Sequence, residues 1–197
     1  MMKHIIIIIT LFYTVVLFGQ EHEELYMLNA DSTWLKEVIK FPLSFAQDIN
    51  YEGYEDLRFA KNWSKPEGTE FFTYAFVWNI NLKDMPTIEM IETNMKLYYD
   101  GLMEAVNKER GFVVPKTQVE FKKLENKSES PGFRGKMKVH DSFFTREIID
   151  LYVTIETSYC SEQDKYLMFF RISSLDFKNE IWNELNTISL ASDICNK

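Results

Sequence analysis

Apolar and polar residues alternate along four consecutive segments in the second half of the chain. These segments read TQVEFKKLE, FRGKMKV, EIIDLYVTIETSYC and YLMFFRISS, and the turn-forming sequences NKSESPG, HDS and SEQDK separate them. Because successive residues of a strand point to opposite faces of a sheet, this alternation predicts β-strands. Since the connections are short and contain no helix, the four strands are expected to pair as an antiparallel meander.

The second and third of these strands, 133–139 and 147–160, both carry their apolar residues at odd positions. The apolar side chains share one face only if odd positions lie opposite odd positions. The sum of two paired residue numbers must therefore be even, and a sum of 288 pairs Lys138 with Asp150, Lys136 with Tyr152 and Arg134 with Thr154. We interpret the resulting row of cations as one side of a solvated ladder. A recognition face for an anionic glycan or peptide is the alternative.

The stretch Glu70–Leu82 carries large residues at its even positions and smaller ones at its odd positions. Two apolar faces predict a central strand, with another element packed closely on the small-residue face. The next segment, 86–111, has apolar residues at helical spacing, Thr87 as an N-cap and Gly111 as a stop. This helix is the candidate for the close packing, which would also explain Gly101 in its middle. Its Met and Tyr residues are interpreted as core.

Two further elements complete the predicted fold. A strand from Trp34 to Phe41 ends at Pro42, and the segment Phe177–Cys195 is predicted to be a helix. This order predicts an α+β fold: a mainly antiparallel sheet of about six strands, with a long central helix and a C-terminal helix packed on it, like an α/β/α sandwich. In element order the chain resembles the PsbP-like sandwich, and without a shared motif the resemblance implies no function.

The stretch FPLSFAQDINYEGYEDLRFAKNW, residues 41–63, follows neither a strand period nor a helix period cleanly. Gly53 predicts a turn, and residues 56–60 predict a short strand. We expect the acidic residues and Tyr54 to stay in water. The residues expected to reach the core are Phe41, Phe45, Ile49, Leu57 and Phe59.

Residues 1–19 are predicted to be a signal peptide. Lys3 precedes an apolar run from Ile5 to Phe18, which at about 1.5 Å per helical residue is too short for a ~30 Å hydrocarbon core. Gly19 marks a cleavage point of a kind common in bacterial secretory proteins, and no lipoprotein Cys follows the apolar run. An uncleaved membrane anchor is the alternative. Residues 20–33 are expected to be a flexible acidic leader, and residues 34–197 a single globular domain.

Charge and cysteine content bear on partners and compartment. A net charge of −8 with no cation-dense stretch argues against nucleic acid as a partner, and no stable membrane insertion is expected after signal cleavage. Cys160 and Cys195 are expected to form a structural disulfide, because a strand followed by an antiparallel helix would return the chain to the same level. Two separate buried thiols are the alternative. We expect a periplasmic or extracellular location.

Sequence motifs give little support to catalysis. His140 is the single histidine of the predicted domain, so neither a zinc site nor any other metal or cofactor is expected. His140-Asp141-Ser142 contains the residue types of a hydrolase triad, but neighbours on an extended chain cannot form the triad's relay. We interpret these residues as a turn whose Asp and Ser cap backbone groups. The sequence also lacks the glycine motifs of phosphate and dinucleotide binding and the nucleophile elbow.

One acidic and aromatic turn is the candidate ligand-binding site. Its residues are Tyr51, Glu52, Tyr54, Glu55, Asp56 and Trp63. The aromatic rings could stack on sugars, and a pair of the carboxylates could hydrolyse a glycoside. The expected function is a non-catalytic binding or accessory domain of the cell envelope, with a protein, peptide or glycan as its partner; a motif-poor carboxylate hydrolase is the alternative. The hydrolase requires the three carboxylates to converge on one concave site.

Overall fold

The computed structural model describes residues 27–125 and 132–196, and seven strands of this part form one antiparallel sheet. The spatial order of the strands is β2-β3-β4-β8-β7-β6-β5. Their bounds are β2 Leu35–Lys40, β3 Gly53–Phe59, β4 Tyr74–Ile80, β5 Gln118–Lys123, β6 Gly132–His140, β7 Ile148–Cys160 and β8 Lys165–Ser173. The predicted antiparallel sheet is confirmed, with one strand more than expected. The predicted signal peptide lies outside the described residues.

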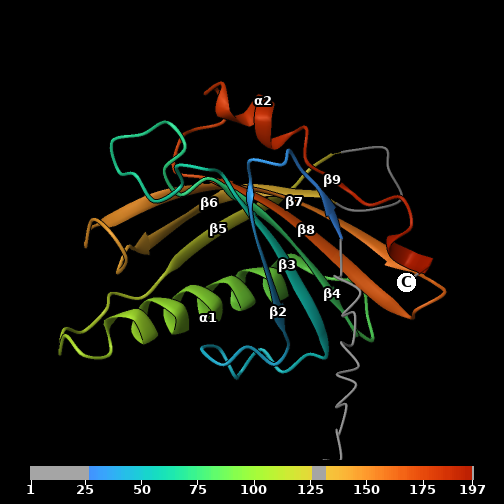
Figure 1. The fold of residues 1–197 in the computed structure, drawn as a ribbon. Coiled ribbons are helices and arrows are strands. Elements are labelled where there is room, and N and C mark those ends of the chain that lie inside the picture. The colour runs from blue at the N-terminus through green and yellow to red at the C-terminus, as the bar shows by residue number, and fades with distance from the viewer. Residues whose placement is uncertain (1–26, 126–131, 197) are drawn as a thin grey trace, which may run out of the picture.

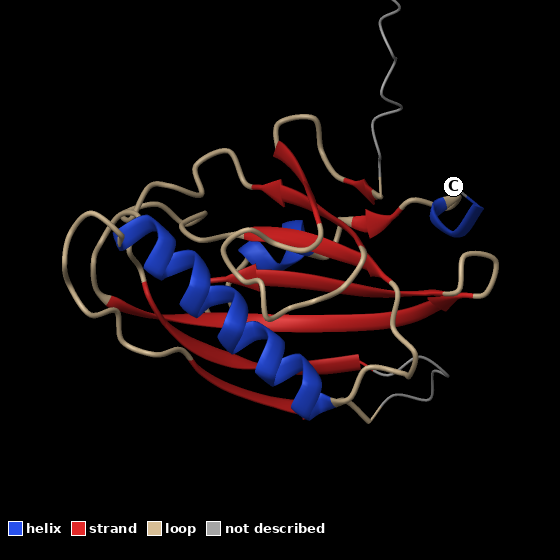
Figure 2. Ribbon diagram, turned by 90° about the horizontal axis from the view of Figure 1, so that it is seen from below, coloured by secondary structure: helices blue, strands red, loops and turns tan. Residues whose placement is uncertain are grey.

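Helices cover both faces of this sheet (Figure 1). The long helix α1, Ile88–Asn107, runs diagonally across one face (Figure 2). The other face carries the short helix α2, Ile181–Leu185, and a two-stranded sheet made of β1, Leu28–Asn29, and β9, Ser189–Leu190. The predicted α+β class is therefore confirmed. None of the helices in the described part of the chain is long and apolar enough to cross a membrane.

The pairing of β6 with β7 has the predicted register. Lys138 lies opposite Asp150, Lys136 opposite Tyr152 and Arg134 opposite Thr154. The ammonium of Lys136 lies 3.4 Å from a carboxylate oxygen of Asp150, and both side chains are well exposed, so this contact contributes less than ~1 kcal/mol. The guanidinium of Arg134 lies 3.5 Å from the ring centre of Phe177, so this cation packs against the C-terminal segment.

Helix α1 begins as predicted but packs on the opposite face of β4. The hydroxyl of Thr87 accepts a hydrogen bond from the backbone N–H of Met90 at 3.3 Å, which confirms the N-cap, whereas the helix ends at Asn107, before Gly111. The ring of Tyr98 stacks on Phe76 of β4, with 5.9 Å between ring centres. The prediction that the helix covers the small-residue face is wrong, because the large side chains of β4 fill the space beneath it.

Gly101 marks a close contact between α1 and a loop. A Cβ atom at this position would lie 1.9 Å from the carbonyl oxygen of Phe45, in the loop that follows β2. The predicted close approach is therefore present, and its partner is loop backbone instead of a strand. Only glycine allows the helix and this loop to meet at such a distance.

The face of the sheet away from α1 is covered by both ends of the described chain. Met27 and Leu28 are buried there, although they belong to the segment expected to be a flexible leader. On β4, the small Ala75 lies between its cross-strand neighbours Arg58 on β3 and Arg171 on β8. The small residues of β4 therefore leave room for two buried arginine side chains.

The predicted helix from Phe177 to Cys195 forms only in part. Helix α2 has five residues, and the indole N–H of Trp182 donates a hydrogen bond to the carbonyl oxygen of Leu175 at 3.0 Å. The residues after α2 are rich in Asn, Thr, Ser and Ile, which are weak helix formers. Two of them pair with β1 as strand β9, so tertiary pairing replaces the helix.

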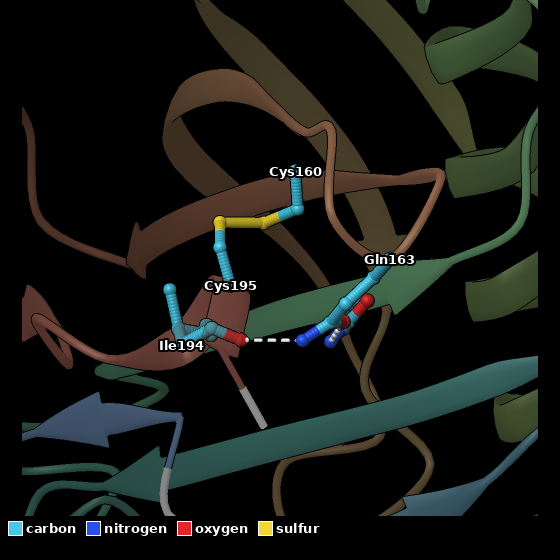
Figure 3. The surroundings of a disulfide bond; sticks show 5 residues. Cys160, Gln163, Ile194 and Cys195 are labelled. Atoms are coloured by element: carbon cyan, nitrogen blue, oxygen red, sulfur yellow. Dashed lines mark hydrogen bonds between the residues drawn. A yellow bond between two sulfur atoms is a disulfide. The ribbon is translucent and has the colours of Figure 1, made fainter.

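Cys160 at the end of β7 and Cys195 in the 3₁₀ turn η1, Ile194–Asn196, form a disulfide (Figure 3). Beside it, the side-chain amide of Gln163 donates a hydrogen bond to the carbonyl oxygen of Ile194 at 2.9 Å. The predicted pairing of the cysteines is confirmed, and it ties the C-terminal segment to the β7–β8 hairpin. Disulfides of this kind are typical of proteins from oxidising compartments.

Candidate functional site

Strand β3 brings two acidic residues of the expected turn into the protein interior. Glu55 and Asp56 are both 0 % exposed, so the expectation that they stay in water is wrong. The strand begins at Gly53, earlier than predicted, and its alternation places Glu55 with Leu57 on the α1 face and Asp56 on the other face. The five apolar residues expected in the core do reach it, Phe45 and Phe59 as partly buried side chains at its margin.

The carboxyl group of Glu55 lies between the sheet and α1. The hydroxyl of Tyr98 donates a hydrogen bond to its Oε1 atom at 3.1 Å. The indole N–H of Trp78 faces the same carboxyl from the neighbouring β4, at a geometry short of a full hydrogen bond. Burial raises the pKa of Glu55 to about 8; Trp78 and Tyr98 oppose this rise, and the charge of Glu37 adds to it. Glu55 is therefore mostly protonated at neutral pH.

The carboxylate of Asp56 holds strand β1 on the other face of the sheet. Its Oδ2 atom accepts hydrogen bonds from the backbone N–H groups of Met27 at 2.8 Å and Leu28 at 3.2 Å. Arg58 forms a buried ion pair with the same carboxylate, and its guanidinium also donates to the carbonyl oxygen of Leu28 at 3.2 Å. The ion pair therefore has a structural role in fixing the N-terminal strand.

The three carboxylates of the hydrolase hypothesis do not converge. Glu55 and Asp56 lie on opposite faces of the sheet, while Glu52 is exposed and binds Asn81 through its backbone N–H at 2.8 Å. A glycosidase needs its two carboxyl groups on either side of one scissile bond. The geometry of these residues therefore does not favour a carboxylate-pair hydrolase.

The remaining expected site residues also separate. The hydroxyl of Tyr51 accepts a hydrogen bond from the side-chain amide of Asn94 at 2.8 Å, which ties it to α1. Tyr54 packs on the face of the sheet opposite α1, against the buried apolar residues of α2 and their neighbours. Of the six expected residues, Trp63 alone lines the large groove described next.

A groove of about 980 Å³, here called the α1 groove, lies between α1 and the β2 end of the sheet. Its outer wall is the whole of strand β2. Its other lining residues are mostly aromatic or aliphatic: Phe45, Leu57, Phe59, Trp63, Phe72, Tyr74, Tyr98, Tyr99, Leu102, Val106 and Phe143, with Ser44. A largely apolar concave site of this volume is typical of ligand-binding pockets.

Three tyrosines give the α1 groove hydrogen-bonding groups without charge. The hydroxyls of Tyr74 and Tyr99 are hydrogen-bonded to each other, and that of Tyr98 is bonded to Glu55. Burial raises the pKa of all three hydroxyls above the usual value for tyrosine. Because the tyrosines stay protonated, this part of the groove offers neutral surface and suits apolar groups.

The turn that contains Asp141 contributes Phe143 to the lining of the α1 groove. The buried carboxylate of Asp141 accepts hydrogen bonds from the backbone N–H groups of Phe143 at 2.9 Å, Phe144 at 3.1 Å and Thr145 at 2.6 Å. This confirms the capping turn for Asp141, whereas the buried hydroxyl of Ser142 has no partner among the described residues. The turn thus orders Phe143 at the groove, instead of building a catalytic triad.

Strand β2 presents an open edge to the α1 groove. It pairs with β3 on one side, and no strand within residues 27–125 or 132–196 pairs with its other side. The N–H of Phe41 donates to the carbonyl oxygen of Gly53, so odd-numbered residues of β2 bond to β3. The backbone N–H and C=O groups of Val38 and Lys40 therefore point outward.

No protein family, curated protein or solved structure matches the chain. Among the residues that the structure describes, no group of three or more His, Cys, Asp or Glu side chains could hold a metal ion. The geometry of the α1 groove is therefore the main guide to function.

Sequence reasoning missed most of the α1 groove. Leu102 and Val106 belong to the apolar residues at helical spacing in the predicted helix 86–111. They are only partly buried because the groove opens over them. One signal could have indicated the open wall: the segment LKEVIK carries lysines on both sides of Val38, which is typical of an edge strand.

Proposed function

We propose that the protein is an exported, non-catalytic binding domain of the cell envelope, and that the α1 groove is its ligand site. The observation that carries the proposal is the groove itself, whose volume of about 980 Å³ and mostly apolar lining suit a ligand with an apolar surface. The separation of Glu55 from Asp56 supports binding over hydrolysis, and among the described residues Glu37 is the one acidic residue that lines the groove.

Export to a periplasmic or extracellular location is part of this proposal. It is supported by the Cys160–Cys195 disulfide, since such bonds persist in oxidising compartments. The apolar run after Lys3, interpreted as a signal peptide, points the same way. The partner would then be an envelope protein, peptide or glycan that presents apolar groups to the groove.

The groove can be tested with Nile red, an uncharged dye whose fluorescence rises in apolar surroundings. We expect saturable binding to the disulfide-bonded protein. The substitution Val106→Trp should fill the α1 groove and weaken dye binding by about tenfold, since it removes apolar contact area worth ~1.4 kcal/mol or more. The matched control Ala105→Trp, at an exposed position of the same helix, should leave binding unchanged.

Two results would contradict the proposal. Dye binding could be lacking although circular dichroism shows a folded protein, which would mean that the groove takes no apolar ligand. Alternatively, Val106→Trp and Ala105→Trp could bind the dye equally well, which would place the binding site elsewhere.

A further inference from the structure

We propose that the ligand of the α1 groove is an extended peptide segment that adds as a strand to the outer edge of β2. This inference rests on the proposed function of the groove. It commits to a partner that carries acidic residues on one face of the added strand and apolar residues on the other.

The first argument is the composition of the groove wall. All six residues of Leu35–Lys40 line the groove, which at about 3.3 Å per residue makes a wall of ~20 Å. The backbone groups of Val38 and Lys40 point outward from this wall, as the hydrogen bonding of β2 with β3 requires. A lipid or a sugar has no regularly spaced donors and acceptors to pair with these outward backbone groups. A peptide strand pairs with them through its own N–H and C=O groups.

The second argument is the position of apolar surface on β2. The side chain of Leu35 is 51 % exposed and that of Val38 is 39 % exposed, so each would be covered further by a neighbouring strand. On the groove side, Ile39 is already packed against the core. An added strand therefore meets apolar surface beside its backbone, and its groove-facing side chains would enter the α1 groove.

The third argument is charge. Lys36 and Lys40 border the groove, but their side chains belong to the face of β2 opposite that of Glu37 and Ile39, because their cross-strand partners Arg58 and Tyr54 lie on the face of β3 opposite Glu55. Acidic residues directly across a ladder from lysines contribute roughly 0.2–1 kcal/mol per pair. The face of the added strand that lies away from the groove should therefore be acidic.

The same lysines disfavour a second copy of this chain as the occupant. Two β2 strands paired antiparallel about Val38 would place Lys36 of each copy opposite Lys40 of the other. Like charges directly opposite each other are destabilising, and lysines on edge strands are a common protection against self-pairing. The occupant is therefore a different chain with complementary charge.

The test uses a fluorescein-labelled peptide that alternates glutamate with valine and phenylalanine, measured by fluorescence anisotropy on the disulfide-bonded protein. A second peptide carries the same side chains but N-methyl groups on alternate backbone nitrogens, which abolishes donation to β2. We expect the first peptide to bind saturably and the N-methylated peptide to bind about tenfold more weakly or worse, since each lost hydrogen bond costs ~1 kcal/mol.

The substitution Val38→Pro provides the matching change in the protein. Proline at this position removes an outward N–H and keeps the bonds between β2 and β3, whereas Val38→Thr keeps the N–H and the shape. We expect Val38→Pro to weaken peptide binding by about fivefold or more, and Val38→Thr, which keeps the backbone donor, to weaken it clearly less. Lys40→Glu should also weaken it, because it places like charges opposite each other.

Nile red separates this inference from the proposed function. If the dye binds and the peptide does not, or if both peptides bind equally well, strand addition is wrong while the groove remains a binding site. If neither dye nor peptide binds, both proposals fail. Should Val38→Pro fail to fold, the comparison of the two peptides on the unmodified protein still decides the question.

Discussion

Glu55 should make the stability of the protein fall as the pH rises from acidic to mildly alkaline values. Its carboxyl is fully buried, and its pKa is raised from 4.5 to about 8. Between these two pH values the folded protein holds a proton that the unfolded chain has released. The free energy of unfolding therefore decreases with increasing pH throughout this window, by about 1.4 kcal/mol for each pH unit.

The substitution Glu55→Gln removes this dependence. Glutamine keeps the oxygen that accepts the hydrogen bond of Tyr98, and it carries no charge at any pH. The free energy of unfolding of Glu55→Gln minus that of the unmodified protein should rise by roughly 4 kcal/mol between pH 5 and pH 8. Such a change is a large part of the 5–15 kcal/mol that is typical of whole domains.

Urea unfolding at intervals of pH, with the disulfide intact, measures this difference. Glu67→Gln is the matched control, because Glu67 is exposed and its replacement should leave the pH dependence unchanged. If the difference between Glu55→Gln and the unmodified protein stayed constant within about 0.5 kcal/mol from pH 5 to pH 9, the reasoning from burial would be refuted.

Two further predictions concern packing. Arg58→Met should lower the free energy of unfolding by about 3–5 kcal/mol in urea titrations, because it leaves the buried carboxylate of Asp56 without its cation. Adding Asp56→Asn to this variant should recover part of the loss. If the double variant recovered nothing, the ion-pair explanation would be contradicted. Gly101→Ala should destabilise the protein by about 1–3 kcal/mol in the same assay, because the new Cβ would meet the carbonyl oxygen of Phe45. Lys96→Ala is the control, since Lys96 is exposed on the same helix and its replacement should change the stability little. A Gly101→Ala variant more stable than the unmodified protein would mean that the helix and the loop are not in tight contact.

Local alternation was enough to predict much of the sheet. In β6 and β7 the apolar residues fall at odd positions, and that parity limited the pairing to registers such as the observed one, in which Lys138 lies opposite Asp150. The N-cap at Thr87 was also predictable, because capping depends on residues within one helical turn. Such features involve neighbours in sequence or one repeated spacing.

The buried acids of β3 were not predictable in the same way. Carboxylates are rarely buried without partners, so an acidic run is normally assigned to solvent. The partner of Asp56 is only two residues away, at Arg58, and this spacing was a usable signal. The partner of Glu55 is Tyr98, forty-three residues away, and only the packing of α1 on the sheet brings the two together.

The α1 groove depends on the same long-range packing. The residues around it belong to five separated parts of the chain, and each part taken alone looks like ordinary core or surface. The C-terminal segment gives a further example. Ser189 of β9 pairs with Asn29 of β1, which lies about 160 residues earlier in the sequence. A helical pattern in one segment cannot reveal that a distant strand will pair with this segment and replace the helix.

The disulfide has a mechanical consequence. A pulling force applied at the C-terminal end of the described chain would reach Cys195 first and pass through the sulfur bridge to Cys160, at the end of β7. The short pairing of β1 with β9 would be bypassed on that side. At the other end, tension on Met27 would pass to β3 through the carboxylate of Asp56. The load would therefore be carried across β3, β4, β8 and β7, none of which is an edge strand of the seven-stranded sheet.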